Sequence, residues 1–127
     1  MSREVVLKDN AFLVSETNSK GIITFANDEF CSIAEYSKDE LLGEPHNIVR
    51  HEEMPKAAFE DLWKTVSKGL VWQGFVKNKT KSGAFYWVFA TVYPFKNENG
   101  EQCFMSCRRK PRESEVKKAI ELYRTMN

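Results

Sequence analysis

The chain has 127 residues, of which 42% are hydrophobic and 29% are charged, and its formal net charge is +1. This length and this balance are typical of one globular domain with a core of its own. Acidic and basic residues are interleaved, without the concentrated basic face that nucleic-acid binders present. No run approaches the roughly 18 apolar residues that a membrane span needs, and residues 1–10 contain no apolar signal core. We therefore expect neither nucleic-acid binding nor membrane contact by this segment.

Three cysteines, Cys31, Cys103 and Cys107, lie inside expected helices or strands. Their odd number and placement argue against a disulfide framework and favour a reducing, cytoplasmic compartment. Cys103 and Cys107 have no matching Cys or His pair near them, which favours core cysteines over metal ligands. We expect a cytoplasmic domain without a metal site.

The first third of the chain predicts a hairpin followed by short helices. Strands are expected at 12–17 and 21–26, because residues 18–20 between them are turn formers. Asn27 is placed to cap a first helix, and Ser37 opens a second, brief one with glutamate three residues later, the spacing of a capping box.

Residues 44–54 are irregular and polar, and a longer helix is expected to follow from Pro55 to the glycine at 69. Its apolar residues recur at the i, i+3, i+4, i+7 spacing of a buried stripe, namely Phe59, Leu62, Trp63 and Val66. Beyond it the period changes to that of strands, which we expect at 71–80, 84–95 and 102–109. Pro111 ends the last strand, and a short amphipathic helix follows.

Grouped helices between two strands and a three-strand meander indicate an α+β fold. We expect a five-stranded antiparallel sheet with short helices on one face and a C-terminal helix. Such an arrangement leaves a pocket between helices and sheet, which is a common place for a ligand.

Two polar features bear on that pocket. Arg50 beside His51, just before a helix, suits an anion, because guanidinium groups and free amides at a helix start both attract phosphate. Composition alone favours a plainer interpretation, a solvated loop with a surface ion pair such as Arg50 with Glu53. In the strand at 71–80, alternation puts Asn78 on the pocket side.

A buried amide needs hydrogen-bond partners, and Asn78 offers a donor and an acceptor that match the edge of a flavin or a pterin. A bond to neighbouring backbone is about as common. Gly74 on the same face leaves room for a flat ring to approach the sheet. Phe59 and Trp63 could form the opposite wall, although their spacing by itself favours ordinary core packing.

The strand at 84–95 is apolar on both faces, so its second face needs a cover. The terminal helix, the N-terminal segment or another subunit could supply it, and we favour a dimer or a downstream helix. His46 and His51 have no Ser or Cys spaced for activation, and no phosphate-cradling glycine loop occurs. We therefore do not expect an enzyme.

The order of elements resembles the PAS fold. The runs His46 to His51 and Met54 to Phe59 closely resemble the FAD-binding PAS domain of bacterial aerotaxis receptors. The likeness continues through Trp63, Lys68-Gly69, Trp72, Gly74, Val76 to Asn78 and Tyr86 to Val88, and so spans about residues 10–110. A related pattern occurs in the flavoprotein PAS domain of a nitrogen-fixation regulator.

This resemblance implies a bound FAD. The family's FAD-linked positions match Asn27, Arg50, His51, Phe59, Trp63 and Asn78, and Glu53 stands where the family usually has aspartate. Light-sensing flavin relatives carry a reactive cysteine where this chain has His46, so no thiol is available for a photo-adduct. Together with Trp72, these residues form the candidate FAD site.

The function implied is a sensor of redox or oxygen status that transmits the state of the flavin. Residues 1–110 would form the sensor domain, and residues 111–127 a helix or linker toward an output module. A homodimer or a downstream signalling domain, of the chemotaxis receptor or kinase type, would be the partner. Two alternatives stay open: a haem PAS domain with His46 or His51 as axial ligand, and a cofactor-free PAS module for dimerisation or docking.

Overall fold

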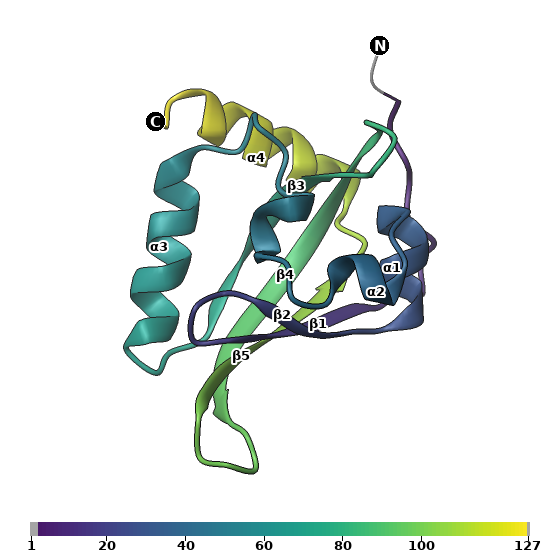
Figure 1. The fold of residues 1–127 in the computed structure, drawn as a ribbon. Helices are drawn as coiled ribbons and strands as arrows, with labels where there is room; N and C mark the ends of the chain where they lie inside the picture. The colour runs from purple at the N-terminus through teal and green to yellow at the C-terminus, as the bar shows by residue number, and fades with distance from the viewer. Residues whose placement is uncertain (1–2, 127) are drawn as a thin grey trace.

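The computed structural model describes residues 3–126 and contains one antiparallel sheet with helices on both of its faces (Figure 1). The five strands lie in the order β2-β1-β5-β4-β3. Their bounds are Leu13–Asn18 for β1, Ile23–Ala26 for β2, Trp72–Lys79 for β3, Phe85–Lys96 for β4 and Gln102–Arg109 for β5. The expected α+β architecture is confirmed, and each expected strand lies within two residues of its predicted position.

The helices between β2 and β3 cover one face of the sheet, which we call the inner face (Figure 1). They are α1 (Asp28–Ala34), α2 (Lys38–Leu41), the 3₁₀ helix η1 (His46–Val49) and α3 (Lys56–Ser67). The helix α4 (Glu113–Arg124) follows β5. Within residues 3–126, no helix is both long and apolar enough to cross a membrane.

Local chemistry explains where the inner helices begin. The Asn27 side chain accepts hydrogen bonds from the backbone N–H of Phe30 and of Val14, so it caps α1 and ties that helix to β1. Ser37 and Glu40 form the expected capping box at α2. Pro55 precedes α3, and Gly69 just beyond its end has a φ of +84°, a conformation that glycine adopts without strain.

Strand register decides which side chains face inward. Asn78 pairs with Tyr86, Ala90 pairs with Arg108, and Leu13 also pairs with Arg108, so these residues lie on the same face of four neighbouring strands. Tyr86 and Leu13 are fully buried there. The inner face is therefore the floor of the main core.

The outer face of β4 is covered by the chain's own ends. The ring of Tyr123 in α4 stacks on Trp87, with 6.4 Å between ring centroids, and the Tyr123 hydroxyl donates to the backbone carbonyl of Phe75 at 2.6 Å. The N-terminal segment bridges to Phe85, whose carbonyl accepts from the Val5 N–H at 2.8 Å. Two of the three covers expected for this apolar face are thus present.

Candidate functional site

A cavity of about 400 Å³ lies between the inner face of the sheet, η1 and α3, and we call it the inner cavity. Its size falls within the range of small-molecule sites, about 300–1,000 Å³. Apolar side chains make up much of the wall: Val49, Phe59, Leu62, Trp63, Val76, Ala90, Val92 and Phe104. The inner cavity lies where the sequence predicts a ligand pocket.

The sheet places buried polar side chains at the inner cavity. Asn78 is 3% exposed and lines the cavity, so its amide belongs to the cavity floor. Thr17 Oγ1 and the hydroxyl of Tyr86, the cross-strand partner of Asn78, are buried without a hydrogen-bond partner within residues 3–126. Buried groups of this kind are uncommon, because each costs about 1–3 kcal/mol if it stays unpaired. The polar groups of the cavity floor are therefore available to form hydrogen bonds with a ligand.

Arg108 forms the end of this floor and is 3% exposed. Its Nη2 donates to Ser15 Oγ at 2.8 Å and to His46 Nε2 at 2.7 Å, and its guanidinium lies 4.7 Å from the centre of the Phe30 ring. The His46 ring in turn stacks on Phe30. Arginine can only donate, so Nε2 of His46 is the acceptor and its proton lies on Nδ1.

Burial decides the charge of this cluster. Loss of solvent and, second, the nearby Arg108 charge lower the pKa of His46 to about 3, so its imidazole is neutral at pH 7. Burial also lowers the pKa of Arg108, to about 10, which leaves it cationic. The cavity wall thus combines a neutral histidine with a buried positive charge.

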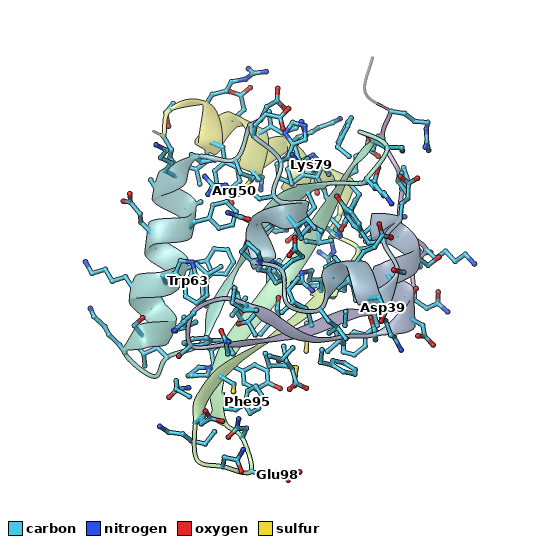
Figure 2. The ribbon with its side chains drawn as sticks, in the orientation of Figure 1. Asp39, Arg50, Trp63, Lys79, Phe95 and Glu98 are labelled. Atoms are coloured by element: carbon cyan, nitrogen blue, oxygen red, sulfur yellow. The ribbon has the colours of Figure 1, made fainter. Side chains whose placement is uncertain are left out.

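No aspartate or glutamate is among the described residues that line the inner cavity. Three cations line it, namely Lys20, Arg50 and Arg108. Arg50 lies at the end of η1 with its guanidinium 4.3 Å from the centre of the Phe59 ring. Figure 2 shows Arg50 and Trp63 in the space between α3 and the sheet. The site is electropositive, which favours an anionic ligand.

Five of the nine residues expected at the site line the inner cavity, namely His46, Arg50, Phe59, Trp63 and Asn78. Trp63 of α3 packs edge-on against Phe104 of β5, with 5.3 Å between ring centroids. It is 38% exposed, more than a core aromatic would be. Phe59 and Trp63 therefore form the wall opposite the sheet.

The other four expected residues lie outside the inner cavity. Asn27 is occupied at the start of α1, where its Nδ2 also donates to the carbonyl of Phe12 at 2.8 Å. The Nδ1 of His51 accepts from the Glu53 N–H at 3.1 Å, and the Glu53 carboxylate binds the ammonium of Lys77. Burial lowers the pKa of His51, whose ring meets the edge of Phe85. These contacts hold the chain just before α3.

Trp72 changes one expectation. Its indole lies over Gly74, where a Cβ would come within 2.4 Å of the ring, and its Nε1 donates to Asp61 of α3 at 2.8 Å. The expectation that Gly74 leaves room for a bound ring is wrong, because Trp72 of the same strand fills that space. Trp72 thus links β3 to α3 and is not among the residues that line the inner cavity.

Sequence reasoning missed Arg108, Ser15 and Thr17. Arg108 is the first of two adjacent arginines at the end of a strand, where a charged side chain is normally solvated. Alternation from Phe104 does place Arg108 on the inner side, and that signal could have found it. Its burial, however, depends on how β1 and β4 flank β5.

Comparison with known proteins gives concordant results. A family profile described as PAS fold matches residues 23–109. The aerotaxis receptor of Escherichia coli K12 is 43% identical over 121 residues, which is 95% of this chain and 24% of the receptor. The nitrogen fixation regulatory protein of Klebsiella pneumoniae is 28% identical over 88 residues, 69% of this chain and 18% of that protein.

Solved structures share the fold at low sequence identity. The dark structure of the blue-light photoreceptor Aureochrome1 LOV aligns with a TM-score of 0.74 and 18% identity, covering 88% of this chain and 84% of that chain. The chain spans about a quarter or less of the length of the curated relatives it matches. The resemblance first seen at residues 46–59 extends over most of the chain, and the chain belongs to the PAS fold family.

Proposed function

We propose that this domain binds FAD non-covalently in the inner cavity and passes the redox state of the flavin to a signalling partner. The observation that carries the proposal is the buried amide of Asn78 on the floor of the inner cavity. The 43% identity to a protein named an aerotaxis receptor supports a role in sensing oxygen or respiratory state. A structure similar in fold, at 19% identity, concerns a flavin analogue in a light-oxygen-voltage domain.

The residues present fit FAD in shape and in chemistry. The sheet side of the cavity, formed in part by Val76, Ala90 and Val92, is apolar and faces the rings of Phe59 and Trp63, so a flat aromatic body can lie between them. Asn78 offers a donor and an acceptor side by side, as the polar edge of a flavin requires. At the rim, Arg50 and Lys20 would hold the phosphates.

When bound, FAD supplies a ring that accepts and returns electrons. The chain's own part begins at Asn78, whose amide can exchange donor for acceptor by rotating its side chain. Its backbone is bridged to Arg50, and three residues earlier in β3 the carbonyl of Phe75 accepts from Tyr123 of α4. A preference of about 1–3 kcal/mol at Asn78 would be enough to bias two arrangements of α4.

This route implies a division of the chain. Residues 1–110 form the sensor, and residues 111–127, which include α4, lead to an output module of the chemotaxis receptor or kinase type. A cytoplasmic location and a homodimer accord with this role. Among the described residues that line the cavity, His46 is bonded to Arg108 and no carboxylate is present, so we propose sensing rather than catalysis.

The two alternatives fit the site less well. A haem ligand would have to come from His46, whose Nε2 accepts from Arg108, or from His51, which lies outside the inner cavity. A cofactor-free module should have a filled pocket, whereas this one keeps about 400 Å³ lined in part by Thr17, whose hydroxyl has no hydrogen-bond partner within residues 3–126.

The test is an absorption spectrum of the purified protein followed by titration with FAD. We expect flavin bands and a yellow protein, and at least about tenfold weaker FAD binding in Asn78→Leu, because the amide is lost. Asn99→Leu, in the exposed β4–β5 turn, is the matched control and should bind FAD as the wild type does. A colourless protein that binds no added FAD, or a Soret band in place of flavin bands, would contradict the proposal.

A further inference from the structure

Thr17 of β1 carries a buried hydroxyl at the inner cavity. The residue is 5% exposed and lines the cavity, and its Oγ1 has no hydrogen-bond partner within residues 3–126. A buried hydroxyl in this state lowers stability, so a ligand that bonds to it gains free energy. The other hydroxyl of β1 differs, because Ser15 Oγ already accepts from Arg108 at 2.8 Å. Thr17 is therefore the hydroxyl of β1 that remains available to a ligand.

A β-bulge lies next to Thr17 in the β1–β2 pair. Glu16 pairs with Phe25 and Thr17 pairs with Ile23, so Thr24 of β2 is an extra residue at this point. Bulges are frequent beside functional sites, where they re-aim a side chain. Three residues of the β1–β2 turn that follows also line the inner cavity. The end of β1 is thus shaped by the cavity as well as by strand pairing.

Thr17 and Asn78 lie at opposite ends of the inner cavity. Asn78 pairs with Tyr86 of β4, whereas Thr17 pairs with Phe104, which pairs in turn with Pro94 of β4. Eight residues of β4 separate the two rows (94 minus 86), which is about 26 Å along the strand. A flavin ring whose polar edge meets Asn78 is much shorter than this, and its other end carries only methyl groups. The ring alone therefore cannot satisfy Thr17.

The end of the cavity formed by Thr17, Gly21, Trp63 and Phe104, which we call the Thr17 end, suits an aromatic group that carries hydroxyls. Trp63 packs edge-on against Phe104, the cross-strand partner of Thr17. A Cβ at Gly21 would lie 3.7 Å from the Trp63 ring, so the turn borders that ring closely. Trp63 is 38% exposed and keeps surface for a further aromatic contact. Lys20 of the same turn offers a positive charge to a phosphate.

We propose that Thr17 is a specificity-determining residue that binds the adenosine part of FAD and so selects FAD over FMN. This inference rests on the proposed binding of FAD. Adenosine combines a flat aromatic base with ribose hydroxyls beside a phosphate, as the Thr17 end requires. The Thr17 hydroxyl can donate to a base nitrogen or a ribose oxygen and can accept from a ribose hydroxyl. FMN ends at its single phosphate and leaves Thr17 unsatisfied.

The experiment titrates the FAD-free protein with FAD and, separately, with FMN, and follows the quenching of flavin fluorescence. In the wild type we expect FAD to bind at least about tenfold more tightly than FMN. Thr17→Val keeps the shape of the side chain and removes the hydroxyl. Its affinity for FAD should fall by about fivefold, while its affinity for FMN stays within about twofold of the wild type. Thr17→Ser keeps a hydroxyl and should retain the preference for FAD.

Two further measurements separate ligand binding from a structural role of Thr17. Thr17→Val removes an unpaired buried hydroxyl, so the melting temperature of the FAD-free protein should not fall. The matched control is Thr91→Val on the outer face, where Thr91 Oγ1 accepts from Gln73 at 3.2 Å. This variant should leave both affinities unchanged. If Thr17→Val does not fold, the same titrations of Thr17→Ala decide the question.

The two proposals fail in different ways. Equal affinity of the wild type for FAD and FMN would overturn the role of Thr17. So would a Thr17→Val protein that keeps its affinity for FAD, or one that loses affinity for both flavins by the same factor. Each of these results leaves flavin binding intact. A protein that binds neither flavin contradicts the proposed function, and the role of Thr17 falls with it.

Discussion

The two faces of the sheet bury similar side chains but treat polar groups differently. On the outer face, Trp87 packs on Tyr123, and the Tyr123 hydroxyl is satisfied by a backbone carbonyl. On the inner face, the hydroxyls of Thr17 and Tyr86 are just as buried yet unpaired within residues 3–126, and Arg108 has no counter-ion in that range. Both faces belong to the same strands, so strand chemistry alone does not explain the contrast.

The difference separates stability from function. A face that serves only as core satisfies its polar groups, because an unpaired one lowers the free energy of unfolding. A face that keeps unpaired groups beside a cavity loses stability in the free protein and gains it back when a ligand binds. The outer face is thus the structural one, and the inner face is the one where we propose that a ligand binds.

The largest effect is expected at the outer face. Trp87 is 8% exposed, and Trp87→Ala should lower the free energy of unfolding by about 3–5 kcal/mol, since it removes a large buried ring. Urea unfolding followed by circular dichroism measures this. Leu122→Ala in α4, at a residue that is 59% exposed, is the control and should change it by less than about 0.5 kcal/mol. A loss below 1 kcal/mol for Trp87→Ala would break the assignment of this face to stability.

Asn78→Leu should act in the opposite direction. The substitution keeps the size of the side chain and replaces a buried amide at the cavity with an apolar group, so the FAD-free protein should gain about 1–3 kcal/mol of stability. The same urea unfolding, carried out after FAD is removed, measures the gain. If the FAD-free variant were less stable than the wild type, the Asn78 amide would have a protein partner, and the contrast between the faces would weaken.

Acid should destabilise the protein through His46. Its pKa is about 3 in the folded state and about 6.5 in the unfolded chain, so unfolding takes up a proton below pH 6.5. Stability from this source is complete above pH 6.5 and is lost as the pH falls toward 3. We expect about 1–2 kcal/mol less stability at pH 5 than at pH 7.

Comparing His46→Gln with the wild type at both pH values isolates this contribution, because the carboxylates titrate lower and are common to both proteins. The variant should lose less stability between pH 7 and pH 5. An equal loss in the two proteins would show that His46 is not held neutral beside Arg108.

The smallest effect concerns the link between β3 and α4. Tyr123→Phe removes only the hydroxyl that donates to Phe75, and should lower stability by about 0.5–1.5 kcal/mol. Amide hydrogen exchange in α4 should rise with it, because α4 loses a tie to the sheet. The control is Tyr93→Phe, in β4 away from α4, which should leave exchange in α4 unchanged. Equal exchange in Tyr123→Phe would argue against this hydroxyl as part of the output route.

Much of the fold follows from patterns in the sequence, because each depends on near neighbours. The cap at Asn27, the capping box at Ser37, the end of α3 at Gly69 and the alternation that turns Asn78 inward are all set within a few residues. The inward side of β3 and the aromatic wall of Phe59 and Trp63 were predictable for the same reason.

Only the tertiary structure decided which polar groups meet in the cavity. The Trp72 ring fills the space over Gly74, although alternation alone leaves that space open. Arg108 contacts His46, 62 residues away, only because β1 and β5 pair and η1 brings His46 against Ser15 of β1. Periodicity tells which way a side chain points, but burial and charge pairing depend on what the rest of the chain places in front of it.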